Sequence, residues 1–269
     1  MNLYPSDCIM INGSCYNHVP CTMLQIFSLK LAKLPVDGGF VELYGYVAVR
    51  DDLDPLLHYV VNISRDDPIT LEEGSLIKMV GPKRGIYMQF TTLLEYDLRI
   101  KTGEQEKDDL SLIDGASLIG PAGVLNEPFK FPISSGRGAI GITLSSIPYA
   151  VEATIEVLIS EVQSRFSLSL GCLTSELDEK IRLFDGAIAE SCFLKRYLVA
   201  VMKNSFIDLK FKVGTVPSSF DQHCCSFMAK IHGHDTQEIK TDFALIIVKL
   251  TWSTLRSLKP TLRILKPRT

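Results

Sequence analysis

Two short runs of histidine and cysteine form the densest group of potential metal ligands in the sequence. His223-Cys224-Cys225 and His232-Gly233-His234 lie close enough along the chain for a hairpin to bring them together around zinc, which takes imidazole nitrogen and thiolate sulfur. Adjacent cysteines on a strand point to opposite faces, however, and the chain has no Cys-x-x-Cys pair. We therefore predict no metal site. The residues that could contribute to one are His223, Cys224, Cys225, His232 and His234.

One segment matches a phosphate-binding pattern, Gly136-Arg137-Gly138-Ala139-Ile140-Gly141. A dinucleotide site needs a strand before this pattern and a helix after it, because the pyrophosphate binds free N–H groups at the helix N-terminus. The residues that follow, Ile142-Thr143-Leu144, are typical of a strand. The segment is therefore interpreted as a connection, and no cofactor is predicted.

Acidic side chains gather at two turns that follow apolar segments. Asp51, Asp52 and Asp54 form one group and Asp66-Asp67 the other. Clustered carboxylates can hold calcium, which takes about six to eight oxygen ligands. Acidic turns are also common simply because they are well solvated, and we favour this interpretation.

Basic residues form two matching pairs and a tail. Lys83-Arg84 and Lys195-Arg196 could bind phosphate, although such pairs are more often exposed charge at a turn or sheet edge. From Leu255 to Thr269 the chain has no acidic residue, which makes this tail either a docking segment or a frayed end. The basic residues named as possible partner contacts are Lys83, Arg84, Lys195, Arg196, Arg256, Lys259, Arg263, Lys266 and Arg268.

The segments that must position these residues have the period of strands. In Val41–Val49 the apolar residues alternate with polar or aromatic ones, as in a strand with one buried face. Similar runs, separated by turn residues, continue from Ile26 to Ile119 and predict an all-β fold. Phe243–Trp252 is apolar on both faces, which indicates a central strand with Trp252 in the core.

Segments of the first half return in the second half about 110 residues later and in the same order. The clearest matches are Val41–Val47 with Val151–Val157, Lys83-Arg84 with Lys195-Arg196, and Tyr96–Lys101 with Ile207–Lys212. Any two β-rich halves can be aligned to some extent, but the shared order favours a repeat. We predict two tandem, related β-sandwich-like units packed together, with Val41 equivalent to Val151 and Asp97 to Asp208.

Glycine and proline concentrate between the two halves, as expected of a connection. The predicted divisions are a loose N-terminal leader over 1–25, a first β unit over 26–119, a Gly/Pro-rich linker over 120–138, a second β unit over 139–255 and a basic tail over 256–269.

Composition narrows the class of protein. With 269 residues, 46% of them hydrophobic, the chain can form two packed cores. A net charge of −3 gives no general attraction to nucleic acid or anionic membrane. Seven scattered cysteines, an odd number, favour reduced thiols, and the N-terminus lacks the pattern of a secretory signal. We expect a cytoplasmic or nuclear compartment.

Five segments together resemble a plant domain of unknown function that is expanded in grasses. They are Ile26–Leu31, Val41–Asp51, Gly74–Ile77, Gly81–Ile86 and Val151–Ile155. In some members of that family the domain lies C-terminal to a ribosome-inactivating rRNA N-glycosidase domain, as in jasmonate-induced proteins. The resemblance covers about Ile26 to Trp252. It implies a plant protein linked to stress or defence, and it brings no established active site.

The depurinating domain itself is absent from this chain. Its Glu-Ala-Ala-Arg core is matched here only by Glu152-Ala153, followed by Thr154-Ile155 on a predicted strand. Glu152 is therefore interpreted as a solvated strand residue. Binding of a methylated cap between two tryptophans is also disfavoured, because the chain has one tryptophan.

These observations favour a non-catalytic β-sandwich interaction module of a plant stress- or defence-related protein. The expected partner is a protein, and RNA or an anionic surface could bind through the basic tail. The alternative is a factor associated with rRNA N-glycosidase toxin activity, without the catalytic domain.

Overall fold

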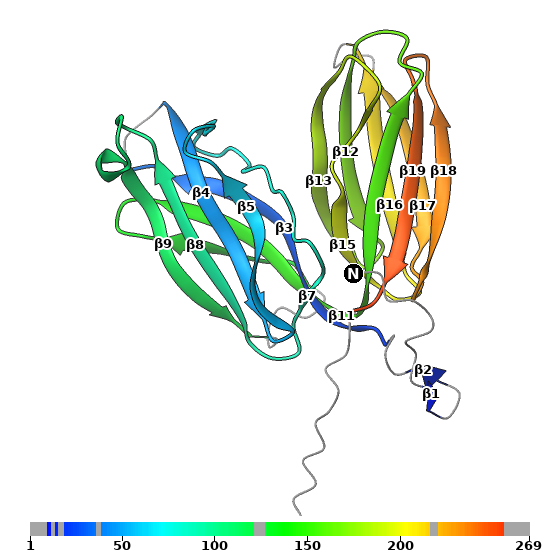
Figure 1. Cartoon of the computed structure of the whole chain (residues 1–269), viewed down its shortest axis with the longest axis horizontal. Coiled ribbons are helices and arrows are strands. Elements are labelled where there is room, and N and C mark those ends of the chain that lie inside the picture. The colour runs from blue at the N-terminus through cyan, green and yellow to red at the C-terminus, as the bar shows by residue number, and fades with distance from the viewer. Residues whose placement is uncertain are drawn as a thin grey trace, which may run out of the picture.

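The computed structural model describes residues 10–11, 14–15, 19–35, 39–120, 127–215 and 220–255 of the chain. Within these ranges the chain is built of strands and one short 3-10 turn, Glu106–Asp108, and contains no α-helix. The strands form two β-sandwiches that stand side by side as the arms of a V and meet at its base (Figure 1). The prediction of an all-β protein with two sandwich-like units packed together is confirmed.

The strands of the described residues are numbered β1 to β19 in chain order. The strands up to β10 are β1 (Met10–Ile11), β2 (Ser14–Cys15), β3 (Cys21–Lys33), β4 (Phe40–Asp51), β5 (Asp54–Ile63), β6 (Ile69–Glu72), β7 (Ile86–Tyr87), β8 (Thr92–Ile100), β9 (Leu110–Ile119) and β10 (Phe129–Ser134). The remaining strands are β11 (Ala139–Ser160), β12 (Phe166–Thr174), β13 (Leu177–Ile188), β14 (Cys192–Phe193), β15 (Tyr197–Met202), β16 (Phe206–Gly214), β17 (Asp221–Met228), β18 (Gly233–Lys240) and β19 (Leu245–Ser253).

The two sandwiches have the same strand order. In the first, the sheet β5-β4-β8-β9 packs on a layer in which β10, the first half of β11, β3 and β7 are neighbours. In the second, β13-β12-β16-β17 packs on β18, β19, the second half of β11 and β15. All pairs are antiparallel. Trp252 on β19 is 2% exposed and lies in the second core, as predicted.

This shared order shows which of the sequence matches connect equivalent strands. Asp97 lies on β8 and Asp208 on β16, which occupy the same place in their sheets. Val41, however, lies on β4, whose counterpart is β12, whereas Val151 lies on β11. That match is wrong because the alternation of valine with glutamate is common to many strands and does not identify one of them.

Strand β11 is shared by both sandwiches. Ile140, Ile142 and Leu144 are buried in the first core. The buried apolar residues of the second half are in the second core: Ile147, Ala150, Val151, Ala153, Ile155, Val157 and Ile159. The pairing of β11 with β3 shifts in register between Ile147 and Ala150, around a proline that has no N–H to give to the sheet. The strand therefore continues from one sandwich into the other at this irregularity.

The predicted linker and the start of the second unit differ from this arrangement. Residues 129–144 belong to the first sandwich, where β10 and β11 form a hairpin closed by a bond from the Ser135 N–H to the Gly138 carbonyl, 2.9 Å. The cores divide inside β11 rather than before Ala139. At the other end β3 begins at Cys21, so residues 21–25 of the predicted leader are part of the folded unit.

Candidate functional site

A buried ion pair fixes the segment that precedes β7. The Arg84 guanidinium donates to both carboxylate oxygens of Asp51, at 2.7 Å each, and the backbone N–H groups of Leu53 and Tyr87 donate to the same carboxylate. Asp51 is only 8% exposed. The prediction that Asp51 belongs to a solvated turn is therefore wrong, because four donors replace the water around its carboxylate.

A second buried carboxylate links this segment to the other sandwich. Glu152 on β11 accepts hydrogen bonds from the Gly85 N–H and, at 2.9 Å, from the Ser253 hydroxyl on β19. It is 6% exposed, so its interpretation as a solvated residue is wrong. Glycine at position 85 suits this close approach, because a Cβ there would lie 2.8 Å from the Met23 sulfur and 3.2 Å from Glu152 Cγ, and both side chains would have to shift. The segment Gly81–Ile86, distinctive in the sequence, thus ties the two units together.

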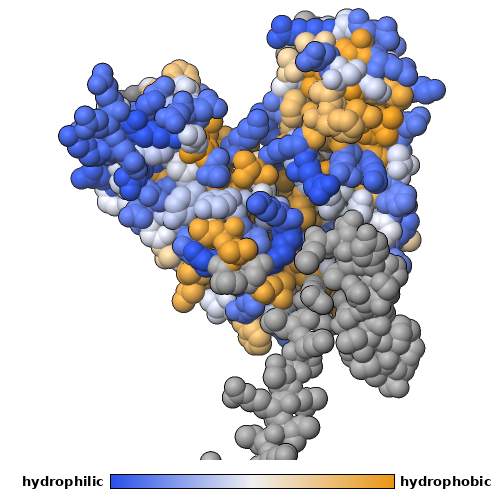
Figure 2. All heavy atoms as spheres, in the orientation of Figure 1, coloured by the Kyte–Doolittle hydropathy of each residue, from blue (hydrophilic) through white to orange (hydrophobic). Residues whose placement is uncertain are grey.

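A groove lies between the sandwiches beside this junction. It contains two adjoining cavities of about 120 and 40 Å³ that share Met79, Arg182 and Leu183 in their walls. The first sandwich contributes β3, β5 and the segment before β7, and the second contributes β13 and β15. Figure 2 shows hydrophobic surface in the hollow between the two lobes. We call this feature the inter-sandwich groove; its apolar wall includes Leu24, Ile26, Phe27, Val60, Leu76, Ile77, Met79, Val80, Ile181 and Leu183.

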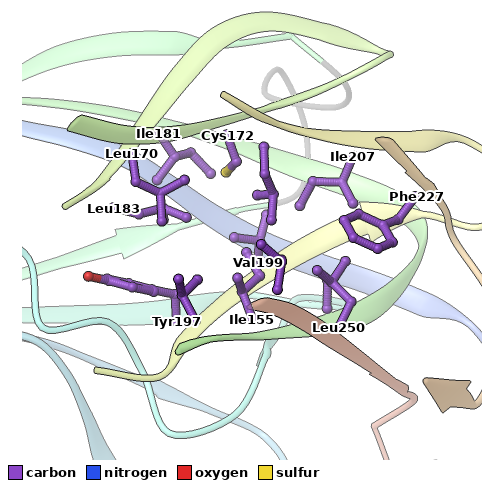
Figure 3. Close-up of a cluster of buried hydrophobic side chains, with 14 of the residues drawn as sticks. Ile155, Leu170, Cys172, Ile181, Leu183, Tyr197, Val199, Ile207, Phe227 and Leu250 are labelled. Atoms are coloured by element: carbon purple, nitrogen blue, oxygen red, sulfur yellow. The ribbon is translucent and has the colours of Figure 1, made fainter. Parts of the chain in front are cut away.

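One wall of the groove holds a buried hydroxyl that has no partner. Tyr197, at the start of β15, lines the smaller cavity and is 6% exposed, and its Oη finds no donor or acceptor among the described residues. Figure 3 shows the ring of Tyr197 with its hydroxyl directed away from the other buried side chains. Burial raises the pKa of Tyr197 to about 12, so the group stays protonated and able to donate.

Lys195 brings a positive charge to the same place. Its ammonium lies 5.1 Å from the centre of the Tyr197 ring and donates to the Met79 carbonyl, while Met79 itself lines both cavities. Burial, followed by repulsion from Lys78, lowers the pKa of Lys195 to about 8. Within the described ranges no carboxylate forms an ion pair with either lysine.

In each of the basic pairs Lys83-Arg84 and Lys195-Arg196, one side chain points into the protein and the other is exposed to solvent. Arg84 and Lys195 turn inward to the contacts just described. Lys83 is exposed, and Arg196, whose side chain is 69% exposed, pairs with Glu156 at 3.0 Å. The pairs are therefore not two uniform basic patches. The tail residues Arg256, Lys259, Arg263, Lys266 and Arg268 lie outside the described residues.

The histidine and cysteine runs lie on different sheets. His223, Cys224 and Cys225 are on β17, and His234 is on β18 in the facing sheet, with His232 just before it. Cys225 is buried and Cys224 exposed, so adjacent residues do point to opposite faces. Across the ranges that the structure describes, no three His, Cys, Asp or Glu side chains lie close enough together to hold a metal ion.

Sequence reasoning missed the groove residues. Met79, Leu183 and Tyr197 come from segments far apart in the chain, and each has the hydrophobic character of an ordinary core residue. The one available signal was the run Gly81–Ile86, whose glycines and charges are unusual for a simple turn.

The chain belongs to a family described as "Domain of unknown function (DUF6598)", whose model matches residues 23–250. No curated protein matches the chain. The match includes both sandwiches, so the family unit is the pair of them.

Several solved structures resemble the chain weakly. One is human GIVD cytosolic phospholipase A2, with 11% identity and a TM-score of 0.27 over 88% of this chain and 30% of that one. The chain thus spans less than a third of that protein. Another is a calcium-bound pair of C2 domains from Extended-Synaptotagmin 2, with 9% identity and a TM-score of 0.31 over 90% and 99% of the two chains. Scores this low assign neither a function nor a site.

Proposed function

We propose that this chain is a non-catalytic interaction module and that the inter-sandwich groove is its binding site. The observation that carries the proposal is that both sandwiches line one apolar groove with a few polar groups, the usual composition of a ligand site. The junction supports this role because Asp51 and Arg84 fix the segment of the first wall, and Glu152 joins that segment to the second sandwich through Gly85.

The state of the reactive groups favours binding over catalysis. Burial raises the pKa of the Cys172 thiol to about 12, which disfavours the nucleophilic thiolate. The buried carboxylates of Asp51 and Glu152 are occupied by bonds within the protein. None of the described helical segments is long and apolar enough to cross a membrane.

The proposal also includes the kind of protein, its cellular compartment and its partner. The resemblance found in the sequence supports a plant stress- or defence-related protein, and the scattered cysteines support a cytoplasmic or nuclear location. A protein partner, contacts through exposed Lys83 and the basic tail, and a role beside an rRNA N-glycosidase domain remain predictions of the sequence.

The groove can be tested with a neutral apolar probe. In a chain labelled with 13C on its methionine methyl groups, titration with 1-octanol should shift the NMR signal of Met79 and leave that of Met228, half-exposed on β17, unchanged. Replacing the half-exposed groove residue in Val80→Asn should weaken the Met79 shift, whereas Leu118→Asn on β9 should not. Equal shifts of Met79 and Met228, or no effect of Val80→Asn, would overturn the proposal.

A further inference from the structure

We propose that the inter-sandwich groove binds a small apolar carboxylate, a free acid with an aliphatic body, whose carboxylate accepts a hydrogen bond from Tyr197. This inference rests on the proposed function and names the ligand class of that same site.

The apolar part of the ligand is set by the walls of the groove. The larger cavity, about 120 Å³, is walled by Phe27, Leu76, Ile77, Met79 and Leu183. An apolar cavity of about 150 Å³ is known to take a benzene-sized molecule. A chain of about six to eight carbons therefore suits the larger cavity and its extension into the smaller one.

The Tyr197 hydroxyl indicates an acceptor on the ligand. It is a buried donor with no partner among the described residues, in a wall formed mainly by apolar side chains, and such a group costs free energy until it is paired. A hydroxyl could bond to an alcohol or to a carboxylate. The bond to a charged acceptor is about twice as strong, so Tyr197 favours the carboxylate.

The charges beside the cavities favour an anion over a neutral acceptor. Lys78 lines the larger cavity, and the Lys195 ammonium lies beside the Tyr197 ring. The acid at the groove, Asp185, is paired with Arg182, so it does not offset the two lysines. Burial and the neighbouring Lys78 both disfavour the charged form of Lys195. An anion at this point attracts both lysines and so favours the charged form of Lys195, which offsets the burial and the repulsion.

The matched test is calorimetry at pH 7 with three ligands of equal chain length: octanoate, 1-octanol and octylammonium. Octanoate should bind at least tenfold more tightly than octanol, and octylammonium most weakly. Tyr197→Phe, which keeps the ring, should weaken octanoate binding by about tenfold and change octanol binding less. Lys195→Met should act in the same direction, while Lys210→Met, an exposed lysine on β16, should have no effect.

The outcomes separate this inference from the proposed function. If octanol shifts Met79 but octanoate binds no more tightly than octanol, and Tyr197→Phe changes neither, the groove is a binding site and the carboxylate class is wrong. If neither ligand shifts Met79, both proposals fail. Octanoate binding that Tyr197→Phe leaves unchanged would also overturn the inference, because the hydroxyl would then not be the donor.

Discussion

Arg84 in the first sandwich and Lys195 in the second each lie two residues before a strand, β7 and β15, and these two strands occupy equivalent places in their sandwiches. Both turn inward, but they meet different partners. Arg84 finds the carboxylate of Asp51, the last residue of β4. The counterpart of β4 is β12, which ends at Thr174. Lys195 donates to the Met79 carbonyl and lies over the Tyr197 ring, and it has no carboxylate partner among the described residues. In the first sandwich the two charges cancel in the Arg84–Asp51 ion pair. In the second, the positive charge of Lys195 remains beside the groove.

The largest expected effect on stability comes from removing the Arg84–Asp51 ion pair. Arg84→Ala leaves the buried Asp51 carboxylate without its cation, and it should lower the free energy of unfolding by about 3 kcal/mol. The matched Arg196→Ala, at an exposed pair with Glu156, should cost less than about 1 kcal/mol. Urea unfolding of both variants measures the difference. Equal, small losses would mean that the two repeats do not differ in this way.

Glu152→Gln tests the link between the sandwiches. The amide keeps one oxygen as an acceptor, but its NH2 group faces the Gly85 N–H or the Ser253 hydroxyl in place of an oxygen. We expect a loss of about 1–2 kcal/mol in the free energy of unfolding. Glu156→Gln, at a partly exposed position four residues along the same strand, is the control and should change it by less than about 0.5 kcal/mol. Similar losses for the two variants would contradict a linking role.

The charge of Lys195 should appear in the pH dependence of stability. Its folded pKa of about 8 lies below the usual value of 10.5, so the folded state binds fewer protons than the unfolded state between these values. The wild type should therefore gain stability from pH 8 to 10.5, by about 1–2 kcal/mol after allowance for partial exposure. Lys195→Met should lack this gain in thermal unfolding at a series of pH values. The same gain in the variant would assign it to another group.

The smallest expected difference in stability is between Tyr→Phe substitutions at Tyr44 and Tyr197. The Tyr44 hydroxyl in the first sandwich donates to Asp109 at 2.8 Å, whereas the Tyr197 hydroxyl has no partner in the described ranges. Tyr44→Phe should lower the free energy of unfolding by about 1 kcal/mol, and Tyr197→Phe should leave it unchanged or raise it by up to about 1 kcal/mol. A loss on Tyr197→Phe equal to that of Tyr44→Phe would show that Tyr197 has a partner within the protein.

Local patterns in the sequence predict much of the fold. The alternation in Val41–Val49 and the apolar run ending at Trp252 predicted real strands, because side chains on a strand alternate between faces whatever the rest of the chain does. The same generality explains the wrong match of Val41 with Val151. The division of the cores inside β11 was missed because Gly136–Gly141 has the composition of a linker and of a hairpin turn alike.

The site depended on contacts that no local pattern records. The buried state of Asp51 and Glu152 follows from donors that lie 33 to 101 residues away in the chain, at Arg84, Gly85 and Ser253. Likewise, a tyrosine in an alternating strand segment gives no sign that its hydroxyl will lack a partner. Folding of the first sandwich buries the turn residue Asp51. The contact between the two sandwiches buries the strand residue Glu152.

The central claim is that both sandwiches contact one ligand in the groove between them. Intermolecular nuclear Overhauser effects from bound octanoate test it most directly. The account predicts that one ligand chain gives effects to Met79 of the first sandwich and to Leu183 and the Tyr197 ring of the second. Effects confined to exposed residues of a single sandwich, such as Leu118 on β9 or Phe193 on β14, would contradict it.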